Sequence, residues 1–88
     1  MFNPITQVNK GDVLQAIKNR DPATGLLFIE KYCLYKGKSS QDTTKFILAL
    51  RMNPFAFQVA FSYAIKEMGR EFEVTILLDT HNQILTAY

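Results

Sequence analysis

Apolar residues recur at helical spacing between residues 53 and 69, NPFAFQVAFSYAIKEMG, and this is the strongest pattern in the chain. Asn53 can cap a helix, Pro54 fits a first helical turn, and Gly69 is typical of the residue that ends one. At about 100° per residue, the apolar positions fall on two nearly opposite faces. One face carries Phe57, Ala60, Phe61, Ala64 and Met68, and the other carries Phe55, Val59 and Tyr63. A helix with two apolar faces needs two partners. We therefore expect it to lie between the other helices and a C-terminal hairpin, or between its own domain and a second subunit.

Two helices are predicted nearer the N-terminus. The first covers about residues 12–19, where apolar positions form a narrow stripe. The second begins at Asp21-Pro22, since aspartate caps a helix and proline fits its first turn, and it ends near Gly37. The apolar run at residues 26–30 is equally compatible with a buried strand, because so short a run does not reveal its period.

A further helix is predicted over about residues 40–52. Ser39 and Asp42 have the spacing of a capping box, in which each side chain accepts the backbone N–H of the other residue. Because Asn53-Pro54 follows directly, this helix and the central helix should meet in a tight corner. The apolar positions again fall on two sides, with Phe46, Ile47 and Leu50 expected in the core and Leu48 and Met52 opposite.

After Gly69 the apolar period changes from that of a helix to that of a strand. Residues 72–78 alternate between apolar and polar, residues 79–82 have the composition of a turn, and QILTAY returns as a second strand. Two registers stay open. A loop of two or four residues places Leu85 and Ala87 on the face of Ile76 and Leu78, whereas a three-residue loop places Ile84, Thr86 and Tyr88 there. We therefore predict a mainly helical α+β fold, with about four helices followed by a C-terminal two-stranded antiparallel hairpin, in a single compact domain of residues 1–88.

Composition limits the class of protein. Of 88 residues, 48% are hydrophobic and 20% are charged, which is typical of a globular chain. Seven Phe and four Tyr are many for so small a core, so we expect some apolar surface to stay exposed or to contact a partner. The net charge of +2 is divided unevenly, with +4 between Lys31 and Arg51 and −3 between Glu67 and Asp79. That division fits either two solvated faces or complementary association with a partner or a second copy.

The sequence predicts a cytoplasmic protein. The first twelve residues contain no positive region followed by a long apolar run, as a secretory signal would. The most apolar window, residues 46–65, contains Arg51 and an Asn-Pro break, which argues against a membrane span. The single cysteine, Cys33, excludes an internal disulfide and is typical of a reducing compartment.

No pattern in the sequence indicates catalysis, a metal or a cofactor, and we expect none. The one histidine, His81, lies in the predicted turn, and a metal ion would need three or four ligands. Cys33 has apolar neighbours, which is typical of a buried, unreactive thiol. Glu71 and Glu73 are predicted on the same strand face, where a solvated strand edge is favoured over a functional carboxylate pair. We therefore predict a protein that is not an enzyme.

Residues 29–48 allow a DNA-binding hypothesis. Their sequence is compatible with a helix-turn-helix motif, with Cys33, Gly37 and Phe46 at the expected positions. Against this, three polar residues, Lys36, Lys38 and Thr43, occupy positions where such a motif usually has apolar ones. Nucleic acid would be contacted through Lys36, Lys38, Ser40, Gln41, Thr44, Lys45 and Arg51.

The favoured hypothesis is a small, non-catalytic regulatory protein that binds another protein, as an adaptor or an inhibitor, and forms a homodimer. Its predicted binding surface is the stripe of Phe55, Val59 and Tyr63. Two predicted helices with apolar residues on opposite faces, the many aromatic residues and the uneven distribution of charge support this hypothesis. The DNA-binding regulator is the alternative.

Overall fold

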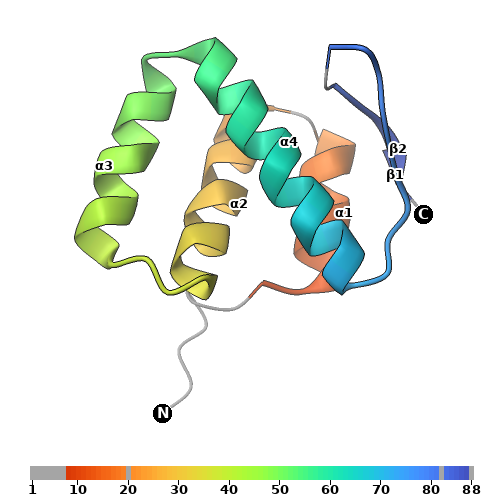
Figure 1. Ribbon diagram of the computed structural model, residues 1–88, viewed down its shortest axis with the longest axis horizontal. Helices are drawn as coiled ribbons and strands as arrows, with labels where there is room; N and C mark the ends of the chain where they lie inside the picture. The colour runs from red at the N-terminus through yellow and green to blue at the C-terminus, as the bar shows by residue number, and fades with distance from the viewer. Residues whose placement is uncertain (1–7, 20, 82, 88) are drawn as a thin grey trace.

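The computed structural model describes residues 8–19, 21–81 and 83–87 of the chain. In these residues four helices precede one antiparallel hairpin: α1 (Lys10–Asn19), α2 (Pro22–Tyr35), α3 (Ser40–Arg51), α4 (Pro54–Glu71), β1 (Ile76–Leu78) and β2 (Ile84–Ala87) (Figure 1). The predicted α+β fold, mainly helical with a C-terminal hairpin, is confirmed. The run at residues 26–30, which the sequence left ambiguous, belongs to α2.

α2 lies in the middle of the helices, with α3 on one side and with α1 and α4 toward the other (Figure 1). α2 and α3 run side by side in opposite directions, and α4 diverges from α3 after the corner at Asn53. The hairpin lies beside α1, at the end of the molecule away from α3.

This arrangement creates two clusters of buried apolar side chains. One joins α1, α2, α4 and the hairpin through residues that include Val13, Ile17, Phe28, Ile65, Met68 and Ile84, and the other joins α2 and α3 through Ile29, Cys33, Ile47 and Leu50.

Three helices begin at the residues that the sequence indicated. A side-chain oxygen of Asp21, Ser39 or Asn53 accepts the backbone N–H three residues later, at 3.0, 3.1 and 3.1 Å respectively. These bonds satisfy N–H groups that have no partner inside the first helical turn. The starts of α2, α3 and α4 are therefore fixed by local sequence.

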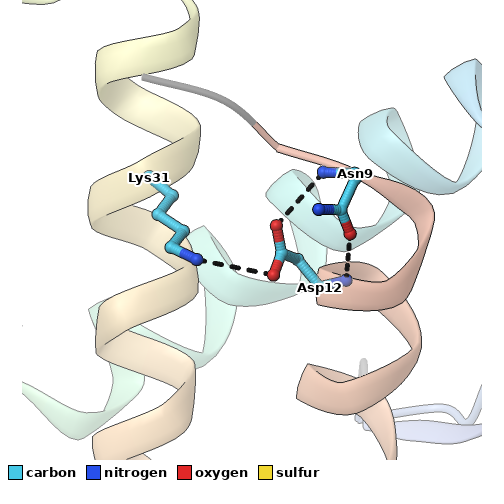
Figure 2. A network of polar contacts seen from close by, with 3 residues as sticks. All are labelled: Asn9, Asp12 and Lys31. Atoms are coloured by element: carbon cyan, nitrogen blue, oxygen red, sulfur yellow. Dashed lines mark hydrogen bonds and ion pairs between the residues drawn. The ribbon is translucent and has the colours of Figure 1, made fainter. Parts of the chain in front are cut away.

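α1 begins at Lys10, earlier than predicted, because Asn9 supplies a cap that the sequence analysis missed. Asn9 Oδ1 accepts the Asp12 N–H at 2.9 Å, and Asp12 Oδ2 accepts the Asn9 N–H at 3.1 Å (Figure 2). The other oxygen of this carboxylate, Oδ1, lies 3.4 Å from Lys31 Nζ in α2. One carboxylate therefore closes the first turn of α1 and also ties α1 to α2. A partly exposed pair of this kind contributes about 0–1 kcal/mol.

Gly69 does not end α4, contrary to the prediction, and the helix continues to Glu71. The chain leaves the helix through Glu73, which has φ of +59°, and the Val74 N–H donates to the Gly69 carbonyl at 2.7 Å. Gly69 is buried because the hairpin packs directly on it. A Cβ at this position would overlap the Ile76 side chain and lie 3.2 Å from the Val74 carbonyl oxygen. Glycine is therefore needed here for close approach of the hairpin.

The first strand is shorter than predicted. It begins at Ile76 because Phe72 and Glu73 form the turn after α4. Glu71 and Glu73 therefore do not share a strand face, since Glu71 is the last residue of α4. The half-buried strand expected over residues 72–78 exists only over its last three residues.

Neither predicted register holds along the whole hairpin. Leu78 pairs with Ile84 and Ile76 pairs with Ala87, because a bulge between Leu77 and Leu78 shifts the register. Ile84 is buried in the core, as the three-residue alternative required. Tyr88, which that alternative also placed on this face, lies outside the described residues.

We expect Gly69→Ala to lower the free energy of unfolding by about 1–3 kcal/mol, because the added methyl group overpacks the contact with Ile76. Urea unfolding measures this cost. The same substitution should cost less in the Ile76→Val background, which lacks the Cδ1 methyl. An equal cost in both backgrounds would contradict the described packing of the hairpin on Gly69.

Candidate binding groove

The second apolar face of α4 is on the surface. Phe55, Val59 and Tyr63 are 75%, 47% and 64% exposed. Residues four apart on a helix are neighbours, so these side chains form one continuous stripe. An exposed apolar patch of large side chains is a common mark of an interaction site. The structure thus places all three predicted residues side by side and outside the core.

This stripe forms one wall of an apolar groove with a volume of about 630 Å³. The groove lies between α3 and α4, and α2 forms its floor. The floor residues are Ile29, Tyr32 and Cys33, the α3 wall consists of Phe46 and Leu50, and the α4 wall consists of Phe55, Ala56, Val59, Ala60 and Tyr63. Lys38, from the turn between α2 and α3, is the one charged residue in the lining.

Two features of α4 keep the groove open. The corner at Asn53 joins α3 and α4 at one end, and the helices diverge from there along α2 (Figure 1). The residues of α4 that line the groove toward the core are Ala56 and Ala60, whose small side chains leave the space unfilled. α3 and α4 are therefore closest at the Asn53 corner and farther apart at their other ends (Figure 1). We call the end of the groove near Lys38 and Tyr63 its wide end.

Hydrogen bonds at the wide end connect α2 to α4. The Tyr32 hydroxyl donates to Glu67 Oε2, and Lys36 Nζ donates to Glu67 Oε1 at 2.7 Å. One turn farther along, the Tyr35 hydroxyl donates to Glu71 Oε1 at 2.5 Å. The bonds from Lys36 and Tyr32 lower the pKa of Glu67, and burial together with the Glu67 carboxylate raises the pKa of Tyr32. These contacts hold α4 against α2 and away from α3.

The wide end of the groove carries a small excess of positive charge, since Lys36, Lys38, Lys66 and Arg70 face only Glu67, Glu71 and Asp42. Lys38 Nζ lies 4.7 Å from the centre of the Phe46 ring, in a cation–π contact. Lys66 and Arg70 are exposed and continue the stripe of α4 at helical spacing beyond Tyr63. None of these three cations forms an ion pair with a carboxylate of the described residues. Of the nearby acids, Glu67 pairs with Lys36 and also interacts with the charge of Arg70, which helps to lower the Glu67 pKa. Glu71 accepts a hydrogen bond from the neutral Tyr35 hydroxyl and Asp42 lies exposed in the first turn of α3, so both keep a negative charge.

The residues of the helix-turn-helix hypothesis are divided among several places. Lys36 pairs with Glu67, Lys38 lines the groove, and Arg51 lies at the far end of α3 from them. The exposed residues at the start of α3 are Ser40, Gln41, Thr44 and Lys45. The helices of a DNA-binding helix-turn-helix cross at about 90–120°, whereas α2 and α3 run side by side in opposite directions (Figure 1).

The other residues considered for chemistry, His81 and Cys33, lie in the hairpin turn and in α2. His81 is exposed in the hairpin turn, where its backbone N–H donates to the Asp79 carboxylate at 2.9 Å. Burial raises the pKa of the Cys33 thiol, which forms part of the groove floor. Within residues 8–19, 21–81 and 83–87, no three His, Cys, Asp or Glu side chains are grouped as metal ligands. None of the helices in these ranges combines the length and the apolar character needed to cross a bilayer.

The sequence analysis missed the floor of the groove. It predicted correctly that Cys33 is buried, but it did not place Cys33 in a groove lining and gave no role to Tyr32. α2 is apolar on most sides, so its sequence pattern does not distinguish a side chain covered by another helix from one at the bottom of a groove. Gly37 and Ser39 indicated the turn between α2 and α3, but they did not show that Lys38 lines the groove.

We compared the chain with protein-family models, with curated proteins and with solved structures. None of the three comparisons gave a match. The groove is therefore interpreted from its own residues and geometry.

We expect Glu67→Gln to lower the free energy of unfolding at neutral pH by about 0.5–1.5 kcal/mol, because it removes a charged hydrogen bond with Lys36. The pKa of Glu67 is lowered in the folded protein, so the unfolded chain binds the proton more readily as the pH falls. The stabilising effect should be complete above the ordinary pKa of 4.5 and should be lost as the pH falls through the folded pKa.

Urea unfolding at neutral pH and at about pH 3 measures this difference between the wild type and Glu67→Gln. Glu73→Gln is the matched control, because Glu73 lies in the exposed turn after α4. This control should change stability by less than about 0.5 kcal/mol at either pH. A Glu67→Gln effect that did not depend on pH would contradict the proposed role of the carboxylate charge.

Proposed function

We propose that this protein is a small, non-catalytic protein-binding module, acting as an adaptor or an inhibitor, and that it receives a segment of a partner in the groove between α2, α3 and α4. One observation carries the proposal: large apolar side chains from three helices line about 630 Å³ of open space. Covering apolar surface is favourable by roughly 25 cal/mol per Å². A partner that covers the stripe of α4 therefore gains binding free energy.

The lining of the groove supports a polypeptide partner better than a small polar substrate. Pockets for metabolites combine apolar walls with several convergent polar groups. Here the polar groups of the lining are Lys38, two tyrosine hydroxyls and the Cys33 thiol, and the Tyr32 hydroxyl is already bonded to Glu67. Apolar side chains of a peptide need no polar partners, and grooves between helices commonly receive them. Self-association, in which a second copy covers the same groove, is the homodimeric form of this proposal.

DNA binding is supported less well. α3 presents exposed polar residues and Lys45 at its start, which could contact phosphates. Two other cations of that hypothesis have contacts within the protein, since Lys36 pairs with Glu67 and Lys38 packs on Phe46. Exposed Leu48 on the same helix and exposed Met52 directly after it also suit a protein surface better than a DNA groove.

We expect the groove to bind peptides selected from a displayed library of random 16-residue sequences, and we expect Val59→Glu to abolish that binding. The new carboxylate would be buried without a partner when a peptide covers the stripe. Phe55→Glu and Tyr63→Glu should act in the same direction. All three variants should keep the wild-type circular dichroism spectrum, because these side chains are exposed.

Leu85→Glu is the matched control, since Leu85 is an exposed apolar residue on the hairpin, outside the groove lining. It should leave peptide binding unchanged. Selected peptides that bind Val59→Glu and Leu85→Glu equally well would show that the groove is not the binding site.

The proposal also predicts no salt-sensitive binding to a labelled random DNA duplex, measured by fluorescence anisotropy at two salt concentrations. Binding that weakens with added salt, and that is reduced by Lys45→Ala and Arg51→Ala, would favour the DNA-binding hypothesis instead. In that case the salt dependence should decrease by about one unit for each phosphate contact removed.

A further inference from the structure

We propose that the partner segment is an amphipathic α-helix whose apolar stripe packs along α4 and α2 and whose end near Lys38 carries acidic residues. This inference rests on the proposed function, because it specifies what the groove receives. Three observations support it: the backbone chemistry of the lining, the length of the stripe, and the charge at the wide end.

The groove is built from helices, whose main-chain groups already bond within each helix. An extended peptide gains its affinity from main-chain hydrogen bonds to an exposed sheet edge, and this lining offers none. Its own N–H and C=O groups would lose water over an apolar surface without gaining partners. A helix bonds these groups internally, so only its side chains need to fit the groove.

The length of the stripe fits about two turns of a bound helix. Phe55 and Tyr63 are separated by eight positions of α4, which corresponds to about 12 Å at the helical rise. Apolar residues at positions i, i+4 and i+7 of a partner helix span a similar distance. The small side chains of Ala56 and Ala60 at the base of this wall give such a helix room to approach.

The charge of the wide end selects an acidic partner. Lys38, Lys66 and Arg70 are exposed there and form no ion pair with a described carboxylate. Glu67 accepts hydrogen bonds from Tyr32 and Lys36, so its charge is already partly compensated within the protein. An acidic group at the end of the partner's apolar stripe would lie beside Lys38 and Lys66, which have no carboxylate partner among the described residues. Complementary charges fix the direction of binding and speed association.

The same charges argue against a second copy of the chain as the occupant. Exposed Leu48 on α3 and exposed Met52 just after it lie near Lys45 and Arg51 in sequence. The exposed stripe of α4 continues into Lys66. Placing these surfaces over a basic groove end would oppose like charges. A fatty acid is also less favoured, because a single acyl chain would leave much of the exposed α4 wall in contact with water.

The test uses three synthetic peptides of about 16 residues, each labelled with fluorescein. The first is a stapled helix with leucines at i, i+4 and i+7 and with glutamates on the adjoining turn. The second replaces the glutamates with lysines, and the third disrupts the helix with two prolines. Each is prepared with the charged turn before or after the leucines, so that both binding directions are covered.

Fluorescence anisotropy compares the wild type with Val59→Glu and with the double variant Lys38→Glu/Lys66→Glu. We expect the acidic helix to bind the wild type most tightly and to bind the double variant about tenfold more weakly. The lysine peptide should show the opposite preference. Val59→Glu should abolish binding of both helices, and Leu85→Glu should leave both unchanged.

The failure of this inference is distinguishable from the failure of the proposed function. Val59-sensitive binding that is equal for all three peptides would overturn the acidic-helix inference and leave the groove as a protein-binding site. Peptide binding that Val59→Glu leaves intact would contradict both. A Val59-dependent dimer in light scattering, with no peptide binding, would identify a second copy as the occupant and overturn this inference. Val59-dependent binding of oleate alone would overturn both proposals.

Discussion

The packing of α4 on α2 is the contact on which the rest of the structure depends. Ile65 and Met68 of α4 enter the cluster shared with α1 and the hairpin, while Phe57 packs against the cluster shared with α3. Phe61 contacts both clusters. One helix thus links the two halves of the core, and it does so with one of its two apolar faces. The other face is covered only in part, where the Tyr63 ring meets the edge of the Tyr32 ring, so its side chains remain largely at the surface.

The groove is a consequence of how the two ends of α4 are held. At its start, the corner at Asn53 leaves almost no chain between α3 and α4. At its other end, Glu67 is bonded to Tyr32 and Lys36 of α2, so α4 follows α2 and separates from α3. α2 therefore forms an apolar floor between the diverging helices, with Ile29 and Cys33 buried and Tyr32 half-buried. The walls and floor of this groove consist of helical residues, and the turn between α2 and α3 adds Lys38 to the lining.

The charge of the molecule is rearranged by folding. The sequence divides into a basic middle and an acidic C-terminal part. In the structure the Glu67 carboxylate bonds Lys36 from the basic part, and Asp79 accepts the backbone N–H groups of the hairpin turn. These contacts use part of the negative charge internally. Lys38, Lys66 and Arg70 at the wide end form no ion pair among the described residues. In the proposed complex they would set the direction in which a partner helix binds.

The sequence by itself indicated four helices in order, with residues 26–30 left open between helix and strand, and the stripe of Phe55, Val59 and Tyr63. Caps and helical periodicity act over three or four residues, so they can be recognised without knowledge of the fold. The tertiary structure alone decided the bulge in the hairpin, the packing of Ile76 on Gly69 and the floor of the groove. Each of these depends on contacts between distant parts of the chain, such as Tyr32 with Glu67, which are 35 positions apart. Local pattern shows which side chains need covering, but only the arrangement of the helices decides which of them are covered.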